Sequence, residues 1–250
     1  MKRLPIGRLN LYILRHLYTL DNMIDVNITD FKNMLNLAGA FSSEATFKVK
    51  DKCLILSVLD TAHVAMAKGV MAFTGDAGVD EFTVDVEKMQ KALTTTGDDV
   101  HMEIGDGLLT LSGGKAKVKI SLISSDITNL KEPNFQIKAS GKIQPSRLKS
   151  AFAYGMLTKA DHVVITVNEG KLFFETGEYP NTALIEGDED GEGTATAGFM
   201  LDYVQTIVDL STKAKSLLKV GLGGTDYPAN FSWAGETANY SVLLAPRIES

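Results

Sequence analysis

The feature that most constrains the fold is a four-fold repeat with a period of about 57 residues. Each repeat holds a short segment with apolar residues at helical spacing, followed by an alternating strand, a tight turn and a second strand. A further strand closes each repeat, and a short strand precedes each helix, as at 81–84 and 136–139. The repeating unit is therefore β-α-β-β-β, with helices expected at 29–38, 86–96, 145–155 and 200–215.

Local signals support these helices. Phe31, Met34, Leu35 and Ala38 follow the spacing of one buried face, and Thr29 or Asp30 is expected to cap that helix. Gly97 is a stop signal for the second helix, and Pro145 suits the first turn of the third. The Asp106-Gly107 pair predicts a hairpin directly after the second helix.

One such unit offers a single apolar sheet face and one helix, which is too little core to stand alone. Two units side by side can bury their helices against their sheets, so four units predict two similar α+β domains with helices on one face of antiparallel sheets. A polar stretch ending at Pro133 reads as a linker at 124–134. The expected domains are 23–123 and 135–250.

Residues 1–22 differ from the rest of the chain. They include one acidic residue, Asp21, and four basic ones, Lys2, Arg3, Arg8 and Arg15. No small-residue cleavage site follows. The segment is a poor secretory signal. A basic targeting helix is one interpretation. The preferred one is that Met23 is the true start and that 1–22 is an extension outside the fold.

The distribution of charge is more informative than the net charge of −6. The helical segments carry seven basic residues and four acidic ones, whereas the rest of 23–250 carries 14 basic and 26 acidic. Cations on exposed helix faces are also common on ordinary solvated surfaces. The alternative is a basic helical surface that faces a phosphate backbone. Its candidate residues are Lys32, Lys88, Lys91, Arg147, Lys149, Lys213 and Lys215.

Signals for a catalytic or cofactor site are weak. Cys53 lies in an apolar run and is expected to be a buried small hydrophobe. The four histidines show no metal spacing, and 221–224 lacks the lysine of a phosphate loop. The acidic stretch 186–192 is read as a solvated loop rather than a cation site. We therefore expect no cofactor and no metal, and the sequence has no apolar run long enough to span a membrane.

Several motifs occur in order on this repeat. Leu243-Leu244-Ala245-Pro246-Arg247-Ile248-Glu249 lies at the C-terminus, Asp60-Thr61-Ala62-His63-Val64 lies in the first unit, and Thr212-Lys213-Ala214 closes the fourth helix. With Pro228 before the last hairpin, they resemble the DNA polymerase sliding clamps of the proliferating cell nuclear antigen family, in an archaeal-like form. The resemblance runs from Met23 to Ser250.

The resemblance implies a non-enzymatic processivity factor that encircles duplex DNA without reading its sequence. It implies a homotrimeric, six-domain ring lined by helices, in which edge strands near 108–112 and 174–182 pair between subunits. The interface residues expected on this basis are Leu109, Leu111, Phe174, Thr176 and Tyr179.

The resemblance also implies a pocket for short clamp-binding peptides of DNA polymerase, flap nuclease and DNA ligase, and an ATPase clamp loader that opens the ring. The matching pocket positions are Leu59, His63, Ile127, Leu130, Pro228, Leu243, Leu244, Ala245 and Pro246. The linker departs from the family pattern because it has few large apolar residues.

Other functions stay open at this level. The chain could be one subunit of a heterotrimeric or checkpoint-type clamp, a monomeric β-rich interaction module, or an enzyme with a metal–carboxylate site at 186–192. A clamp is expected in the cytoplasm at an archaeal nucleoid, or in the nucleus of a eukaryote.

Overall fold

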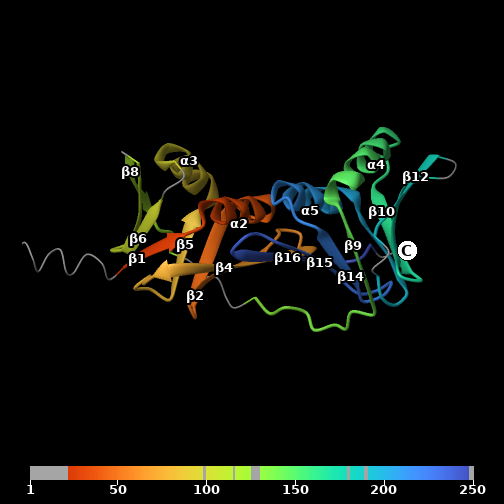
Figure 1. The fold of residues 1–250 in the computed structure, drawn as a ribbon, viewed down its shortest axis with the longest axis horizontal. Coiled ribbons are helices and arrows are strands. Elements are labelled where there is room, and N and C mark those ends of the chain that lie inside the picture. The colour runs from red at the N-terminus through yellow and green to blue at the C-terminus, as the bar shows by residue number, and fades with distance from the viewer. Residues whose placement is uncertain are drawn as a thin grey trace, which may run out of the picture.

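The structure, a computed structural model, describes residues 22–97, 100–114, 116–124, 130–178, 181–188 and 191–247. The predicted extension at 1–22 therefore lies outside the described residues, except for Asn22. Four β-α-β-β-β units follow one another along the chain, which confirms the repeat predicted from sequence. Figure 1 shows their helices along one side of the molecule and their sheets beneath.

The first two units form one half of the molecule. Their elements are β1 (Met23–Val26), α2 (Ile28–Phe41), β2 (Glu44–Lys50), β3 (Cys53–Leu59), β4 (Ala65–Gly75), β5 (Glu81–Asp85), α3 (Val86–Thr96), β6 (His101–Gly105), β7 (Leu108–Gly113) and β8 (Ala116–Ser121).

The last two units form the other half. Their elements are β9 (Ala139–Ile143), α4 (Pro145–Leu157), β10 (His162–Asn168), β11 (Lys171–Glu178), β12 (Asn181–Glu186), β13 (Ala195–Met200), α5 (Leu201–Lys213), β14 (Leu218–Leu222), β15 (Ala229–Ala234) and β16 (Ala238–Leu244). Among the described residues, none of the helices is long and apolar enough to cross a membrane.

The two halves share a sheet. One sheet has the strand order β8-β7-β6-β1-β4-β16-β15-β14-β9, with β2, β3 and β5 attached beside β4, and a second has the order β12-β11-β10-β13. The link is the antiparallel pair β4–β16, which runs from Ala65↔Leu244 to Met71↔Ala238. Because this ladder passes between the halves, the division into domains 23–123 and 135–250 stays a prediction.

The apolar stripes of the helices face the sheets. In α2, Phe31, Met34 and Leu35 are fully buried, and in α3 Met89 and Leu93 are buried while Lys88 and Lys91 are exposed. The periodicity predicted these faces correctly because a 3.6-residue repeat leaves only one stripe for the core.

Some local predictions were wrong. Helix α2 is capped by Asn27, whose side chain accepts a hydrogen bond from the Asp30 amide, rather than by Thr29 or Asp30. The strand expected at 136–139 lies three residues later, as β9. Cys53 is half-buried rather than buried, because it alternates with Leu54 and Leu56, which point into the core.

The Asp30 side chain links α2 to the other half of the molecule through hydrogen bonds. Its side chain is 2% exposed. The carboxylate accepts hydrogen bonds from the Tyr240 hydroxyl at 3.0 Å and from the Thr237 amide at 2.6 Å and hydroxyl at 2.9 Å. Burial and the nearby Asp30 charge both raise the pKa of Tyr240, so its hydroxyl stays protonated and donates.

We expect the Tyr240→Phe variant to lose about 1.5–3 kcal/mol of unfolding free energy, because the Asp30 carboxylate then loses one donor inside the core. Chemical denaturation measures the change. Tyr227→Phe is the matched control: Tyr227 is 49% exposed, and its variant should change stability by less than about 0.5 kcal/mol. Equal stability of the two variants would contradict a structural role for the Tyr240 hydroxyl.

Candidate functional site

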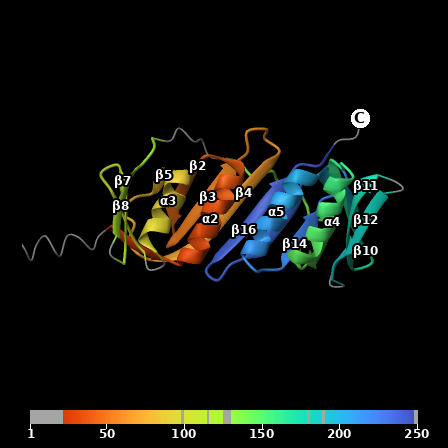
Figure 2. The same cartoon turned by 90° about the horizontal axis from the view of Figure 1, so that it is seen from above.

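The four helices lie side by side in the order α3-α2-α5-α4, and we call this arrangement the helix row (Figure 2). The row carries helices from both halves across the junction. The sheets take the apolar stripe of each helix, so the opposite, polar face of the row is left to solvent. All seven cations predicted to face DNA lie on these helices or directly after them.

Four of the seven cations have an acidic partner on or beside the row. Lys91 pairs closely with Glu87 one turn away. The others pair at longer distances: Lys88 with Asp85 at 3.3 Å, Arg147 with Asp188 at 3.4 Å, and Lys149 with Asp209 at 3.7 Å. These pairs are solvent-exposed, so each contributes little stability and exchanges readily for another anion.

The other three cations differ in position. Lys32 is half-buried on α2 and engaged in an interaction of its own. Lys213 lies in the last turn of α5, where the negative end of the helix favours a cation. Lys215 lies beyond the helix, in a left-handed backbone conformation with φ of 54°, so α5 ends two residues earlier than predicted.

A polar groove in the middle of the row was not predicted from the sequence. A hollow of about 360 Å³ lies among α2, α3 and α5, where Gln90 donates a hydrogen bond to Asn36 at 3.1 Å. Asn36 and Gln90 are 54 residues apart in the chain. Neither lies in a motif, so only the packing of α2 against α3 could reveal that they meet.

A second hollow, of about 240 Å³, lies on the sheet side of the molecule, and we call it the linker hollow. It sits at the end of the β4–β16 ladder that joins the halves. Its lining consists of Leu59, His63, Val64, Ala65, Met66, Lys131, Pro133, Pro228, Leu243 and Ala245. Of the nine residues predicted for the peptide pocket, the structure therefore brings together Leu59, His63, Pro228, Leu243 and Ala245.

The other predicted pocket residues do not line this hollow. Leu244 is fully buried and belongs to the core, because it alternates with Leu243 along β16. Leu130 and Pro246 are half-buried but are not part of the lining. Ile127 lies outside the described residues.

Two linker residues, Lys131 and Pro133, were missed. The residue between them, Glu132, pairs with Lys68 of β4 at 2.5 Å and so holds the linker against the sheet. The linker was expected to contribute little because it has few large apolar residues. Its contact with the sheet is instead an ion pair.

The turn between β3 and β4 forms one wall of the linker hollow and is organised by Asp60. One carboxylate oxygen accepts the Val64 and Ala65 amides, each at 2.7 Å, and the other accepts the Ala62 amide at 3.2 Å. Burial acts to raise the pKa of Asp60, but these hydrogen bonds and one from the Tyr203 hydroxyl outweigh it, so the pKa is lowered. The carboxylate is therefore charged at neutral pH.

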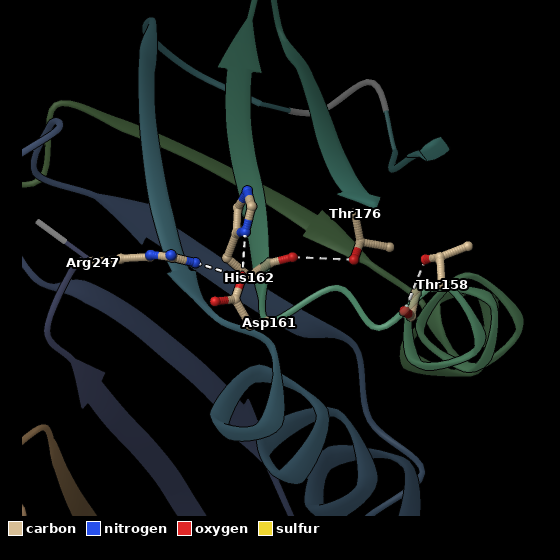
Figure 3. A network of polar contacts seen from close by, with 6 residues as sticks. Thr158, Asp161, His162, Thr176 and Arg247 are labelled. Atoms are coloured by element: carbon tan, nitrogen blue, oxygen red, sulfur yellow. Dashed lines mark hydrogen bonds and ion pairs between the residues drawn. The ribbon is translucent and has the colours of Figure 1, made fainter. Parts of the chain in front are cut away.

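The C-terminal segment after β16 forms another wall and is fixed at two points. The Ala245 amide donates to the Val64 carbonyl at 2.9 Å, and the Arg247 amide donates to the Gly198 carbonyl at 2.8 Å. Figure 3 shows the Arg247 guanidinium directed at Asp161, which it meets at 2.6 Å, while His162 Nδ1 lies 2.8 Å from the same carboxylate. We call Asp161, His162 and Arg247 the tail network.

The predicted subunit-interface residues do not present a surface. Leu109, Leu111, Phe174 and Thr176 are at most 2% exposed, and Tyr179 lies outside the described residues. Thr176 donates its hydroxyl to the His162 carbonyl at 3.1 Å within the same half, as Figure 3 shows. Strand β7 is paired on both sides, by β6 and β8, and β11 is likewise paired by β10 and β12. The first sheet ends in β8 and β9 and the second in β12 and β13, and the two edges at the extremes of the molecule are β8 and β12. The predicted edge at 108–112 was therefore wrong, and residues 174–178 of the other predicted edge belong to the paired strand β11.

The two edges lie at opposite ends of the molecule (Figure 2). At one end, Tyr154 and Leu157 of α4 and Leu184 of β12 are 39%, 82% and 61% exposed. At the other end, a hollow of about 480 Å³ between α3 and β8 is lined by Val118, Ile120 and six further residues: Lys88, Lys91, Ala92, Thr95, Lys119 and Ser121.

Chains of similar sequence are DNA polymerase sliding clamps. The clamp of Methanococcus maripaludis is 26% identical over 249 residues, which cover 90% of this chain and 98% of that protein. The clamp of Methanocella arvoryzae is 27% identical over 247 residues, with the same coverage. Over nearly its whole length, this chain is therefore similar to the DNA polymerase sliding clamps. No family model matches it.

Solved structures show that the sliding clamp fold is shared. The A. fulgidus PCNA bound to the C-terminal region of FEN-1 matches with a TM-score of 0.80 and 22% identity, over 91% of this chain and 99% of that one. The Sulfolobus tokodaii PCNA2–PCNA3 complex matches with a TM-score of 0.77 and 15% identity, over 91% and 99%. The match confirms the predicted fold class.

Within the described part of this clamp, no three His, Cys, Asp or Glu side chains are placed to hold a metal ion. The acidic stretch at 186–192 falls partly outside that part, because Glu189 and Asp190 are not described. The structure therefore does not test the sequence-based reading of that loop.

The tail network gives a prediction for pH dependence. The hydrogen bond from His162, and then that from Arg247, lowers the pKa of Asp161 from 3.8 to about 2. Because the pKa is lower in the folded state, the network contributes to stability above pH 3.8 and loses that contribution as the pH falls through about 2. An NMR titration of the Asp161 carboxyl carbon should therefore show a midpoint near 2.

In Arg247→Ala the midpoint should rise but stay below 3.8, because His162 remains. Arg147→Ala removes a guanidinium elsewhere and should leave the Asp161 midpoint where it was. An unchanged midpoint in Arg247→Ala would show that the tail is not held by Asp161 in solution.

Proposed function

We propose that this protein is a DNA sliding clamp, a non-enzymatic ring that holds replication and repair enzymes on duplex DNA. The observation that carries the proposal is the helix row, which collects the predicted cations on the polar face of one continuous layer. The clamp relatives and the shared fold support it. Such a protein works wherever the chromosome is copied, at an archaeal nucleoid or in a nucleus.

The ring closes by head-to-tail contact between β8 of one subunit and β12 of the next. Two different edges at opposite ends of one chain make a heterologous interface, which closes into a ring when the rotation per subunit allows it. Pairing of the two edges continues the sheet around the ring and removes both unpaired edges. The exposed apolar side chains Tyr154, Leu157 and Leu184 then pack into the hollow between α3 and β8. There they meet Val118, Ile120 and the aliphatic stems of the lysines that line it, whose ammonium groups stay in water.

We propose three copies per ring, so that twelve helices line the hole. The alternative is a heteromeric ring in which this chain is one of several different subunits. The specific observation in its favour is that the S. tokodaii neighbour is a complex of two different clamp chains. The homotrimer is preferred because both halves of the interface, the apolar patch and the matching hollow, are present on this one chain.

The helix row faces duplex DNA inside the ring without reading its bases. Lysine and arginine contacts to phosphate position a protein but carry no sequence information. Because four of the seven cations of the row already have weak, exposed acidic partners, a phosphate can replace an acid there and be replaced again. Retention then depends on the closed ring rather than on affinity, and an ATPase clamp loader must open the ring.

The linker hollow is the docking site for short peptides of DNA polymerase, flap nuclease and DNA ligase. Its volume suits one or two anchoring side chains, and a short amphipathic helix can present them from one face. In the A. fulgidus neighbour the bound segment is the C-terminal region of FEN-1. By this proposal Leu59, Met66, Pro228 and Leu243 supply apolar contacts, and Lys131 contributes from the linker.

The interface makes a prediction about size in solution. The wild-type protein should have three times the chain mass of 27.0 kDa by light scattering. Leu184→Glu should give monomers, because the interface loses the apolar contact of Leu184 and a carboxylate would have to leave water there. Leu217→Glu is the control: Leu217 is 42% exposed but lies on neither edge strand, so the trimer should persist. A wild-type monomer would support the interaction-module reading and contradict the homotrimer.

Encirclement makes a prediction about DNA retention. After loading by an independently active clamp loader, the protein should stay on circular DNA at high salt and be lost from linear DNA. Salt screens phosphate contacts but does not undo a closed ring. Leu184→Glu, mixed with the same loader and circle, should not be retained. Equal loss from both DNA forms by the wild type would overturn the clamp proposal.

A further inference from the structure

The Asp60 carboxylate has a fourth hydrogen-bond donor that comes from the other half of the molecule. The Tyr203 hydroxyl of α5 donates to it at 2.6 Å, across 143 residues of sequence. The other three donors are amides of the same turn. Tyr203 is therefore the side chain outside the turn that contacts Asp60, and it lies on a helix of the row.

The turn that Asp60 organises holds an unfavourable backbone conformation. His63 has φ of 59°, in the left-handed region that costs free energy for a residue with a side chain. Its amide donates to the Asp60 carbonyl at 3.0 Å. Such a conformation persists only where surrounding bonds fix it, and here Asp60 makes those bonds from both its main chain and its side chain. The conformation places His63 in the lining of the linker hollow.

Tyr203 is well placed to hold Asp60. Its ring stacks on Phe41 at the end of α2, with 6.5 Å between centroids and 13° between planes. The hydrogen bond to Asp60, and then burial, raise the pKa of Tyr203 to about 12, so the hydroxyl keeps its proton throughout the neutral range. Tyr203 and Asp60 line a different hollow, on the side of the helix row, and neither lines the linker hollow.

We propose that Tyr203 is a positioning residue for the peptide-binding site: its hydroxyl fixes the Asp60 carboxylate, which fixes the 60–65 turn and hence His63 and Val64 in the linker hollow. This inference rests on the proposed function of that hollow. It makes one wall of the hollow dependent on a residue of α5, a helix on the opposite face. When the turn is not fixed, only a fraction of molecules presents the hollow in its binding shape, and the apparent affinity falls by that fraction.

The test uses the full-length protein and a fluorescent synthetic peptide with the sequence of a flap nuclease C-terminal region. Tyr203→Phe keeps the ring stack on Phe41 and removes only the hydroxyl. Its affinity for the peptide, measured by fluorescence anisotropy, should fall by roughly three- to tenfold. Thr206→Val is the matched control: Thr206 lies one turn away on α5, and its hydroxyl bonds to the Asp202 carbonyl rather than to Asp60. Its affinity should equal that of the wild type.

Amide hydrogen exchange separates positioning from general destabilisation. In Tyr203→Phe the Val64 and Ala65 amides, which donate to Asp60, should exchange faster, while the amides of α5 and of the β4–β16 ladder keep wild-type rates. Faster exchange throughout the molecule would assign Tyr203 a merely structural role and overturn the proposal. If Tyr203→Phe did not fold, Asp60→Asn would be tested, and wild-type affinity in that variant would overturn the proposal as well.

The outcomes distinguish this inference from the proposed function. Wild-type protein that fails to bind the peptide would contradict the peptide-docking proposal, and with it the inference. Wild-type protein that binds, together with Tyr203→Phe that binds equally well, would overturn only the positioning role. Weaker binding with exchange raised only at Val64 and Ala65 would support it.

Discussion

The pairing of β4 with β16 is the interaction on which the rest of the structure depends. It joins the two halves and brings the first and last units of the chain together, since Met71 of β4 pairs with Ala238 of β16. Two buried carboxylates reinforce it from either side: Asp30 of α2 bonds to Tyr240 of β16, and Asp60 bonds to Tyr203 of α5. Each bond crosses the junction, where an unpaired buried acid would be costly. With the junction fixed, α2 lies beside α5, the helix row is continuous, and the linker hollow forms at the end of the ladder.

The sequence predicted what depends on local order. The apolar stripes placed four helices within a few residues, and the strand–turn–strand signals gave the β-α-β-β-β unit, because both follow from residues close in the chain. The prediction of the edge strand was wrong because it also used only residues close in the chain. Alternation shows that Leu109 and Leu111 point inward, but it does not show that β8 continues the sheet beyond β7. Asp30 was taken as a cap because Thr237 and Tyr240, its actual partners, lie more than 200 residues away.

The candidate sites also contain some residues that local sequence predicts and others that only the fold brings together. The strand residues of the linker hollow, such as Leu59 and Leu243, lie in sequence motifs that resemble those of sliding clamps and could be predicted from them. Lys131 and Pro133 lie in no such motif, and the contact that marks this part of the linker joins Glu132 to Lys68, 64 residues earlier. The cations of the helix row were predicted from the sequence, but their acidic partners were not considered. Asp188 and Asp209 reach the row from a loop and from the facing helix, and only the fold brings them to Arg147 and Lys149.

Those acidic partners affect how the inner surface would exchange ions. When a lysine or arginine neutralises a phosphate, a cation condensed on the duplex is released, and the entropy of that release favours binding. Lys88, Lys91, Arg147 and Lys149 already pair with carboxylates attached to the same protein, and these carboxylates cannot leave. A phosphate that displaces one gains no released ion from the protein and leaves a carboxylate beside the duplex. If the helix row faces DNA as proposed, each phosphate contact therefore replaces an ion pair that the protein already has, and the net gain per contact is small.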